Sequence, residues 1–367
     1  MRLLILDQFS DPGGAQQALL ELLPAVREAG WDVLVGMPGN GPLFQQIGAL
    51  GFETAKLDCG PFRCGRKSPL DALRFLGGLP RLARQVQLLE KRIQADLIYV
   101  NGPRLLPVAA GSRLPVVFHS HSLVPAGPSR WIAGNALRRA DASVIAACRF
   151  VAEPWTRFVP RDRVAVIYNG VAARPRKVAR RGGPPRIGCV GRIAPEKGQR
   201  EFLRVASIVH RALPECRFVV CGAPLFSDAC AQRYTARVRA EAIGLPVEFS
   251  GWVSDVDSTL AGLDLLLVPS TVPEATPRVI LEAFAAGVPV IAFPSGGIPE
   301  IARALADSVE QMAAMALAIL TGPAERSARI SQAGREQWRR RFTLDRYRQE
   351  VLVALERAAR VPELTNV

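Results

Sequence analysis

The chain has 367 residues, more than one hydrophobic core usually holds, so we expect two domains. Hydrophobic residues make up 49% of it and charged residues 22%, a composition that excludes a largely disordered protein. The formal net charge of +14 favours partners that carry negative charge, namely nucleic acid, anionic lipid or phosphate-bearing substrates. The sequence has no zinc-finger, helix-turn-helix or RNP-type aromatic pattern, which argues against nucleic acid.

The first half of the chain alternates short apolar runs with helical patterns. Residues 2–7 predict a first strand, a loop with Gly13 and Gly14 follows, and the next helical pattern ends at Gly30. Further strand-like runs lie at residues 31–37, 95–101, 115–121, 142–147 and 164–170. This alternation predicts a doubly wound parallel sheet in an N-terminal Rossmann-like domain, residues 1–171.

The opening segment also bears on location. Asp7 comes too early for the apolar core of a signal peptide, and no apolar run reaches the roughly 18 residues that cross a bilayer. We therefore expect a cytoplasmic protein, with a peripheral position on the inner face of the membrane as the alternative.

The second half of the chain begins after a basic run. Residues 173–186, "ARPRKVARRGGPPR", contain no acidic residue and are rich in Pro and Gly, which predicts a solvated linker at 172–185. Strand and helix patterns then alternate again and predict a second Rossmann-like domain over residues 186–340. Residues 341–367 contain a helical run that no strand follows, and we expect it to pack back on the N-terminal domain.

The stretch "VPEATPRVILEAFAAGVPV", residues 272–290, predicts a loop and a helix between two strands. Thr276 is a plausible N-cap, Pro277 suits the first helical position, and Gly287 ends the helix. Glu274 then lies at the carboxyl end of a strand, where ligands of parallel sheets collect. The free amides at the start of the helix favour an anion beside it.

Cysteine and histidine usage argues against a metal site. The seven cysteines lie mostly in apolar strand-like contexts, which indicates small core residues rather than disulfides or zinc ligands. His119 and His121 alternate along a strand and could share a face, but the only other histidine is His210 in a surface-type helix. We expect no metal and no cofactor.

Several motifs together resemble a known family. "VGRIAPEKGQ", "FSGWV" and "PEATPRVILEAFAAGVPVIAFPSGGIPE" resemble the donor-binding half of retaining GT-B glycosyltransferases, specifically glycosyltransferase family four, also called glycosyl transferases group 1. "GGAQQALLELL", "HSH" and "YNGV" in the first half add a weaker match. The resemblance implies the GT-B fold, in which two Rossmann-like domains face a central cleft and the first domain binds the acceptor.

The resemblance also implies roles for the charged residues. Arg192 and Lys197 would hold the diphosphate of a nucleotide sugar, Glu282 would accept the ribose hydroxyls, and Glu274 would lie beside the transferred sugar. The residues themselves agree, because Arg192 and Lys197 follow a strand in a Gly- and Pro-containing loop before a helix. The alternative interpretation is that Arg192 and Lys197 are ordinary surface charges with no role in binding. Glu282 stands among apolar neighbours and should have a partner.

The remaining implied contacts come from backbone groups and one histidine. Backbone around Trp252 and Val253 resembles the base-contacting segment, and Gly13 and Gly14 resemble the loop by which the first domain approaches the phosphates. His119 resembles the family's histidine near the reacting sugar, and a structural histidine is the alternative.

The sequence departs from the family at two places. Pro277 stands where many relatives have a glycine amide, so a donor contact there would come from Arg278 or Val279. After Glu300 the pattern predicts a direct continuation into helix, whereas relatives usually insert a turn and a short strand.

The sequence thus predicts a metal-independent retaining glycosyltransferase with a nucleotide-sugar donor and a carbohydrate or lipid-linked acceptor, acting in polysaccharide or glycolipid assembly. Two alternatives stay open, a nucleotide-sugar epimerase of the same fold and a non-catalytic protein that binds a membrane surface. Two basic groups on the first domain could dock on anionic lipid or be scattered solubilising charge. They comprise Arg63, Arg66, Lys67, Arg130, Trp131, Arg138 and Arg139.

Overall fold

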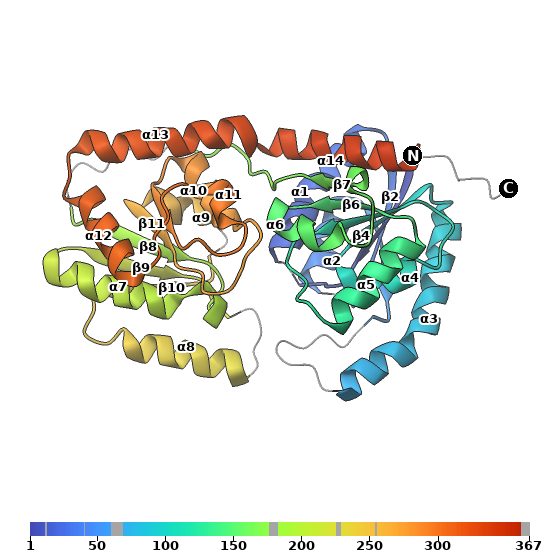
Figure 1. The fold of residues 1–367 in the computed structure, drawn as a ribbon, viewed down its shortest axis with the longest axis horizontal. Coiled ribbons are helices and arrows are strands. Elements are labelled where there is room, and N and C mark those ends of the chain that lie inside the picture. The colour runs from blue at the N-terminus through green and yellow to red at the C-terminus, as the bar shows by residue number, and fades with distance from the viewer. Residues whose placement is uncertain are drawn as a thin grey trace. The chain divides into compact units, whose positions relative to one another are not determined.

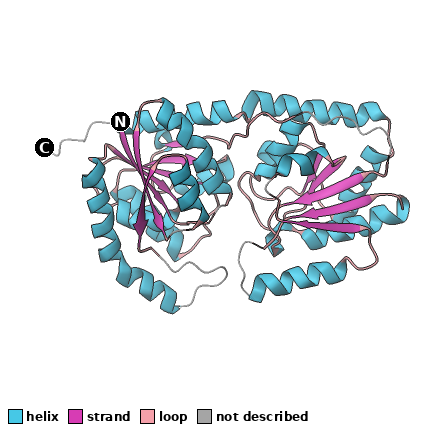
Figure 2. Ribbon diagram, turned by 180° about the vertical axis from the view of Figure 1, so that it is seen from behind, coloured by secondary structure: helices cyan, strands magenta, loops and turns pink. Residues whose placement is uncertain are grey.

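The computed structural model describes residues 1–11, 13–39, 41–59, 69–175, 183–224, 229–253 and 255–360. The chain divides into two compact units. Unit 1 consists of Met1–Asn169 together with the chain from Asp345 onward, and unit 2 is Gly170–Leu344. In each unit helices lie on both faces of a parallel sheet (Figure 1, Figure 2).

Unit 1 is built on a seven-stranded parallel sheet of order β3-β2-β1-β4-β5-β6-β7. Its strands are β1 (Arg2–Asp7), β2 (Asp32–Pro38), β3 (Glu53–Leu57), β4 (Leu97–Asn101), β5 (Val116–Ser120), β6 (Ser143–Ala146) and β7 (Val164–Val166). The strand order reverses between the neighbours β1 and β4. In doubly wound sheets, such a reversal opens a crevice at the carboxyl ends of the strands.

The helices of unit 1 cover both faces of this sheet. They are α1 (Gly14–Glu28), α2 (Pro42–Ala49), α3 (Pro69–Ile93), α4 (Leu106–Ala109), α5 (Pro128–Arg139), α6 (Arg149–Ala152) and α14 (Leu344–Ala359), with short 3-10 helices at Pro103–Leu105, Glu153–Trp155 and Arg161–Arg163. Leu3, Leu4, Ile5 and Leu6 of β1 are all fully buried, as expected for a parallel strand covered on both faces. Helix α14 joins the unit through Tyr347, whose hydroxyl donates to Ala18 O of α1 at 3.3 Å.

Unit 2 is built on a five-stranded parallel sheet of order β10-β9-β8-β11-β12, in which the order reverses between β8 and β11. Its strands are β8 (Arg186–Val190), β9 (Arg217–Cys221), β10 (Val247–Gly251), β11 (Leu265–Val268) and β12 (Val290–Ala292). Its helices are α7 (Gln199–Ala212), α8 (Ala229–Glu241), α9 (Val256–Ala261), α10 (Arg278–Ala286), α11 (Ile298–Ile301), α12 (Val309–Leu320) and α13 (Ala324–Arg341), with a 3-10 helix at Pro195–Lys197. The predicted fold class, two doubly wound parallel sheets, is confirmed.

Within the described residues no helix has both the length and the apolar character needed to cross a bilayer.

The start of α10 differs from the prediction. Thr276 is not the N-cap residue, because the N-cap position is Pro277, whose ψ of 113° lies outside the helical range and whose side chain makes no capping hydrogen bond. The helix therefore begins one residue later than the sequence indicated, and the side chain of Thr276 is buried instead.

The segment after Glu300 also differs from the prediction of a direct continuation into helix. Helix α11 ends at Ile301, and α12 begins only at Val309, where Ser308 caps it. Between them, Leu305 forms an isolated parallel bridge with Ala292 of β12. Ala292 N donates to Ala304 O at 3.0 Å and Ala306 N donates to Ala292 O at 2.9 Å. The segment between α11 and α12 thus pairs with the edge strand β12 through one bridge.

Candidate functional site

Two loops of unit 2 meet at the carboxyl ends of β8 and β11, where the strand order reverses. The loop after β8 ends at Gly198, which has a φ of +69° and starts α7. A Cβ on Gly198 would collide with the backbone oxygen of Pro269, which follows β11. Only glycine allows this approach. The approach brings the loop after β8 into contact with the loop after β11.

Lys197 and Glu274 form an ion pair across these loops. Lys197 Nζ contacts Glu274 Oε2, and the hydroxyl of Ser270 donates to the other oxygen, Oε1. Both charged side chains keep part of their surface exposed, 25% for Lys197 and 17% for Glu274. The sequence placed the two residues near different parts of a ligand and did not predict that they contact each other.

Arg192 lies in the same loop as Lys197, after β8, and is held within that loop. Its Nη2 lies 2.5 Å from Glu196 Oε1, and its backbone oxygen accepts a hydrogen bond from Gln199 Nε2 at 2.8 Å. The Gln199 side chain is buried and so fixes the loop to the start of α7. The side chain of Arg192 remains about one third exposed, so its other guanidinium donors can reach an anion.

The backbone of Glu274 is fixed from the opposite side by the glycines after β12. Gly297 N donates to Glu274 O at 2.7 Å, and Gly296 forms a parallel bridge with Glu274. Gly296 has a φ of +64°, and a Cβ there would collide with the backbone of Glu274. The glycines of "PSGGIPE" therefore set the position of the carboxylate.

Glu282 is largely buried one turn inside α10 and has two cationic partners, as its apolar surroundings predicted. Arg278 Nε lies 3.8 Å from Glu282 Oε1, and Arg174 Nη2 lies 3.4 Å from the same oxygen. Arg174 also pairs with Asp257 of α9.

The sequence interpretation of residues 172–185 as a solvated linker is wrong at Arg174, whose side chain is only 15% exposed. Residues 176–182 of that segment lie outside the described residues.

Trp252 and Val253 follow β10 at the same edge of the sheet. The side chain of Trp252 is prominently exposed, at 62%. Gly222 N donates to Gly251 O at 2.8 Å and ties the end of β10 to the loop after β9. The backbone groups at this edge are thus positioned by the sheet, two strands away from β8.

In unit 1, Gly13 and Gly14 form the start of α1 beside a buried carboxylate. Gly13 is the N-cap residue of α1. The Asp7 carboxylate accepts hydrogen bonds from Gln16 Nε2 at 3.0 Å, Asn101 Nδ2 at 2.5 Å and Phe9 N at 2.8 Å. Complete burial raises the pKa of Asp7 to about 6, although these three donors lower it. The network was not predicted from the sequence, although Asp7 and Asn101 both end apolar strands.

His119 lies in β5 and is fully buried. Its Nδ1 lies 2.5 Å from the hydroxyl of Tyr99, and its ring stacks on His121 with centroids 3.7 Å apart. Burial and the neighbouring His121 hold the pKa of His119 well below its ordinary value, so the imidazole is neutral. The pair does not present His119 at the surface, and the residue nearer the strand end, His121, is half-buried. A sugar contact from His119 stays a prediction.

Among the described residues, no three His, Cys, Asp or Glu side chains gather as metal ligands would. Five described cysteines are buried and form no disulfide within the described residues, and Cys230 is exposed. The charged side chains at the β8 and β11 ends pair with one another, Lys197 with Glu274 and Arg192 with Glu196. The arrangement can hold an anion on Arg192, Lys197 and the start of α10, next to a carboxylate that accepts hydroxyl hydrogens.

Two family models match successive parts of the chain. The model described as Glycosyltransferase Family 4 matches residues 12–174. The model described as Glycosyl transferases group 1 matches residues 172–337, which hold all the charged groups of unit 2 described above.

Curated relatives match at moderate identity. A GDP-mannose-dependent monoacylated alpha-(1-6)-phosphatidylinositol monomannoside mannosyltransferase from Corynebacterium glutamicum is 30% identical over 165 residues, which are 41% of this chain and 42% of that protein. Sulfoquinovosyl transferase SQD2 from Arabidopsis thaliana is 24% identical over 324 residues, 80% of this chain and 59% of that protein. The chain spans about half the length of the curated relatives it matches.

Solved structures match over nearly the whole chain. HepE from Anabaena in complex with UDP has a TM-score of 0.81 at 23% identity and covers 97% of this chain and 100% of that one. The same protein with UDP-glucose has a TM-score of 0.80 at 24% identity, covering 97% and 100%. A glycosyltransferase from Rickettsia africae has a TM-score of 0.80 at 16% identity, covering 98% and 99%. At these identities the likeness shows the fold.

Proposed function

The chain belongs to the glycosyltransferases of the GT-B fold, and from this premise we propose that it moves a sugar from a nucleotide diphosphate sugar to a carbohydrate or lipid-linked acceptor. The observation that carries the proposal is the ion pair of Lys197 with Glu274, which joins the loops after β8 and β11, with the cation of Arg192 in the same loop as Lys197. In this proposal unit 2 binds the donor and unit 1 binds the acceptor. Retention of configuration rests on the family resemblance.

The proposed chemistry is electrostatic. The bond between the anomeric carbon and the diphosphate oxygen breaks and its electrons pass to the diphosphate. The acceptor oxygen forms the new bond to the anomeric carbon and gives its proton to the leaving diphosphate. Arg192, Lys197 and the first turn of α10 stabilise the charge that develops on the leaving diphosphate. Because this positive charge comes from the protein, we propose that no divalent metal and no cofactor takes part.

The two carboxylates divide the donor between them in this proposal. Glu282 lies inside α10 and accepts the hydroxyls of the ribose, since a carboxylate can take two vicinal hydroxyls. Glu274 lies at the strand end and contacts the transferred sugar. Support for a nucleotide donor comes from HepE, whose structures hold UDP and UDP-glucose.

A thermal-shift screen with UDP, GDP, ADP and their sugars tests the donor class. We expect one nucleobase to raise the melting temperature of the protein more than the other two, because the base contacts the segment around Trp252. No shift with any of these compounds contradicts the proposal. Conversion of the donor to its epimer in the absence of acceptor contradicts transfer as the main activity.

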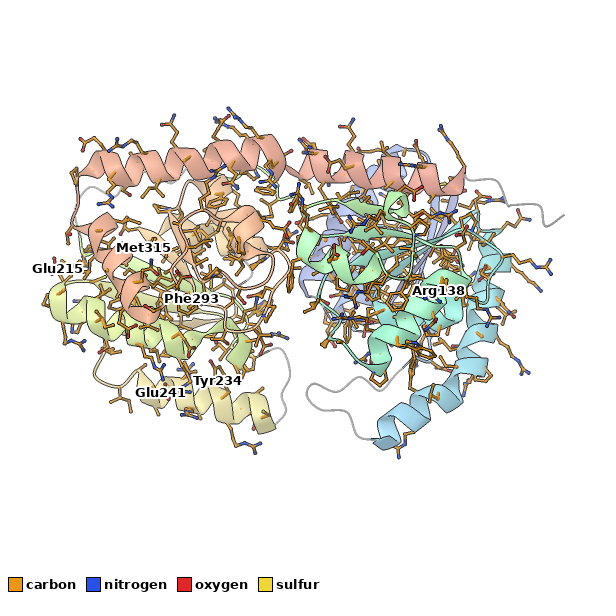
Figure 3. All side chains as sticks on the ribbon, viewed as in Figure 1. Arg138, Glu215, Tyr234, Glu241, Phe293 and Met315 are labelled. Carbon is orange, nitrogen blue, oxygen red and sulfur yellow. The ribbon has the colours of Figure 1, made fainter. Side chains whose placement is uncertain are left out.

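We also propose that unit 1 associates with an anionic membrane surface. Helices α3 and α5 both pack on α4, on one side of the sheet (Figure 1). Their exposed residues mix cations with large apolar side chains, and Arg138 lies on α5 (Figure 3). Exposed Trp131, Leu76 and Leu88 accompany exposed Arg74, Arg84, Lys91, Arg138 and Arg139. Arg63, Arg66 and Lys67, which the sequence added to this surface, lie outside the described residues.

A phospholipid surface also suits the proposed acceptors. The Corynebacterium relative is named for a phosphatidylinositol mannoside acceptor, which resides in a membrane. We place the protein in the cytoplasm, on the inner face of the membrane when it acts on such an acceptor. Each cation near an anionic surface contributes about 1 kcal/mol to binding, and the apolar side chains add to it.

A further inference from the structure

Arg174 connects two helices that follow two different strands of unit 2. Its Nη1 contacts Asp257 of α9, and its Nη2 lies 3.4 Å from Glu282 Oε1 of α10. One guanidinium group thus spans two carboxylates with separate nitrogens, which the planar fork of arginine allows and the single ammonium of lysine does not.

The backbone that carries Arg174 is itself fixed. Three residues earlier, Val171 N donates to Phe342 O at 3.0 Å, and Val171 O accepts hydrogen bonds from Leu344 N and from Trp338 Nε1, both at 3.1 Å. These bonds hold the segment against the end of α13. The backbone close to Arg174 is therefore held in place, which limits the positions that its guanidinium group can take.

The charges of this cluster balance. Arg174 and Arg278 oppose Glu282 and Asp257, and the side chains of Arg174, Arg278 and Glu282 are each at most 15% exposed. Arg278 is held in turn by the oxygen of Gly170, to which its Nη1 donates at 3.3 Å. Loss of Arg174 removes one of the two cations beside Glu282, so the Glu282 carboxylate would move toward water or toward Arg278.

We infer that Arg174 is a positioning residue that holds the Glu282 carboxylate in place for the ribose of the donor, an inference that rests on the proposed function. Both cations approach Oε1 of Glu282, and in this inference Oε2 accepts the ribose hydroxyls. Through Asp257, Arg174 also fixes α9, which begins just after the Trp252 segment. One side chain from the start of unit 2 thereby sets the spacing between the base-contacting segment and the ribose-binding carboxylate.

Removal of the ribose hydroxyls from the ligand separates positioning from a general effect on folding. The test compares the nucleoside diphosphate that wild type binds best with its 2′,3′-dideoxy analogue, by calorimetry. We expect Arg174→Met to lose about tenfold in affinity for the ribose ligand, the size of one charge-assisted hydrogen bond, and to bind the dideoxy analogue as wild type does. Arg174→Lys, which keeps the charge and removes the fork, should lose the same ribose-dependent factor.

Arg200→Met is the matched control. Arg200 also bridges two helices of unit 2, because its Nε on α7 lies 2.8 Å from both oxygens of Glu241 on α8. Figure 3 labels Glu241 on α8. This control should bind both ligands as wild type does. An equal loss on both ligands in Arg174→Met and Arg174→Lys, or a gain on the ribose ligand, overturns the inference. Failure of wild type to bind any nucleoside diphosphate overturns the proposed function instead.

Discussion

Lys197 and Glu274 form an ion pair although they lie 77 residues apart, one in the loop after β8 and the other in the loop after β11. The pair neutralises a cation that an anionic ligand would otherwise meet directly. A diphosphate that binds Lys197 must therefore compete with Glu274 or share the ammonium with it. The ammonium has three hydrogens, so sharing is possible.

Replacement of Lys197 by Ala should weaken the binding of the nucleoside diphosphate. The substitution removes a charge-assisted contact worth about 1.5 to 3 kcal/mol, which is a tenfold to 150-fold loss. Calorimetric titration of the purified variant measures it. Lys91→Ala, an exposed lysine on α3 in unit 1, is the control and should bind as wild type does. Equal affinities of Lys197→Ala and wild type, with the fold intact, would remove Lys197 from the donor site.

Replacement of Glu274 and of Glu282 by Ala should have different effects. Glu282→Ala should weaken the bare nucleoside diphosphate, because the ribose is present in donor and product alike. Glu274→Ala should leave that affinity equal or higher, since it releases Lys197, and should lower the rate of transfer. Diphosphate affinity and single-turnover transfer are measured for both variants. Losses in the same proportion for both quantities contradict the division of the donor between the two carboxylates.

The fold was predictable because each unit repeats one local pattern. Apolar runs such as residues 2–7 are buried on both faces, and glycines such as Gly287, with a φ of +74°, end helices as the sequence indicates. The positions of Arg192, Lys197 and Glu274 at strand ends follow from the same alternation. Local patterns determine which end of a sheet a residue occupies.

The contacts within the site were not predictable because they depend on how distant loops approach one another. The ion pair of Lys197 with Glu274 depends on the close approach of Gly198 to Pro269. Local sequence patterns do not predict this approach. Arg174 stands in a basic run without nearby acids, so the sequence indicated a solvated segment, whereas its carboxylate partners come from helices more than 80 residues later. The lone bridge of Leu305 with Ala292 is likewise too short for a periodic pattern.

Asp7 should make the stability of unit 1 depend on pH. Burial raises the pKa of Asp7 from 3.8 to about 6, so the folded state holds a proton that the unfolded state has lost between these values. Stability should therefore fall as pH rises from about 4 to 6, by about 3 kcal/mol from this residue, and stay lowered above pH 6.

Asp7→Asn isolates this contribution. Asn101 can rotate its amide to accept from the new Asn side chain, because Asn101 Oδ1 has no hydrogen-bond partner among the described residues. The free energy of unfolding of wild type and variant is measured from pH 4 to 7. The free energy of unfolding of the variant should rise relative to that of wild type as the pH rises. Parallel plots of this free energy against pH would show that Asp7 does not titrate in this range.

Transfer should survive chelation of divalent cations. In the proposed mechanism Arg192, Lys197 and the first turn of α10 supply the positive charge at the leaving diphosphate. The rate with the matched donor and acceptor in excess EDTA should equal the rate without it. A loss of activity that manganese or magnesium restores contradicts the proposed mechanism.

Membrane association should depend on the apolar side chains of α3 and α5 as well as on their charge. Trp131 and Leu88 are each 65% exposed, so most of their surface does not pack in the core of unit 1. Flotation with phosphatidylglycerol vesicles should recover wild type at low salt, and about 150 mM salt should reduce recovery because it screens the exposed cations. Trp131→Ala combined with Leu88→Ala should lower recovery further, whereas Ile243→Ala, an exposed apolar residue of unit 2, should not. Equal recovery of wild type with phosphatidylcholine vesicles, or no recovery with either lipid, would leave these cations as solubilising charge.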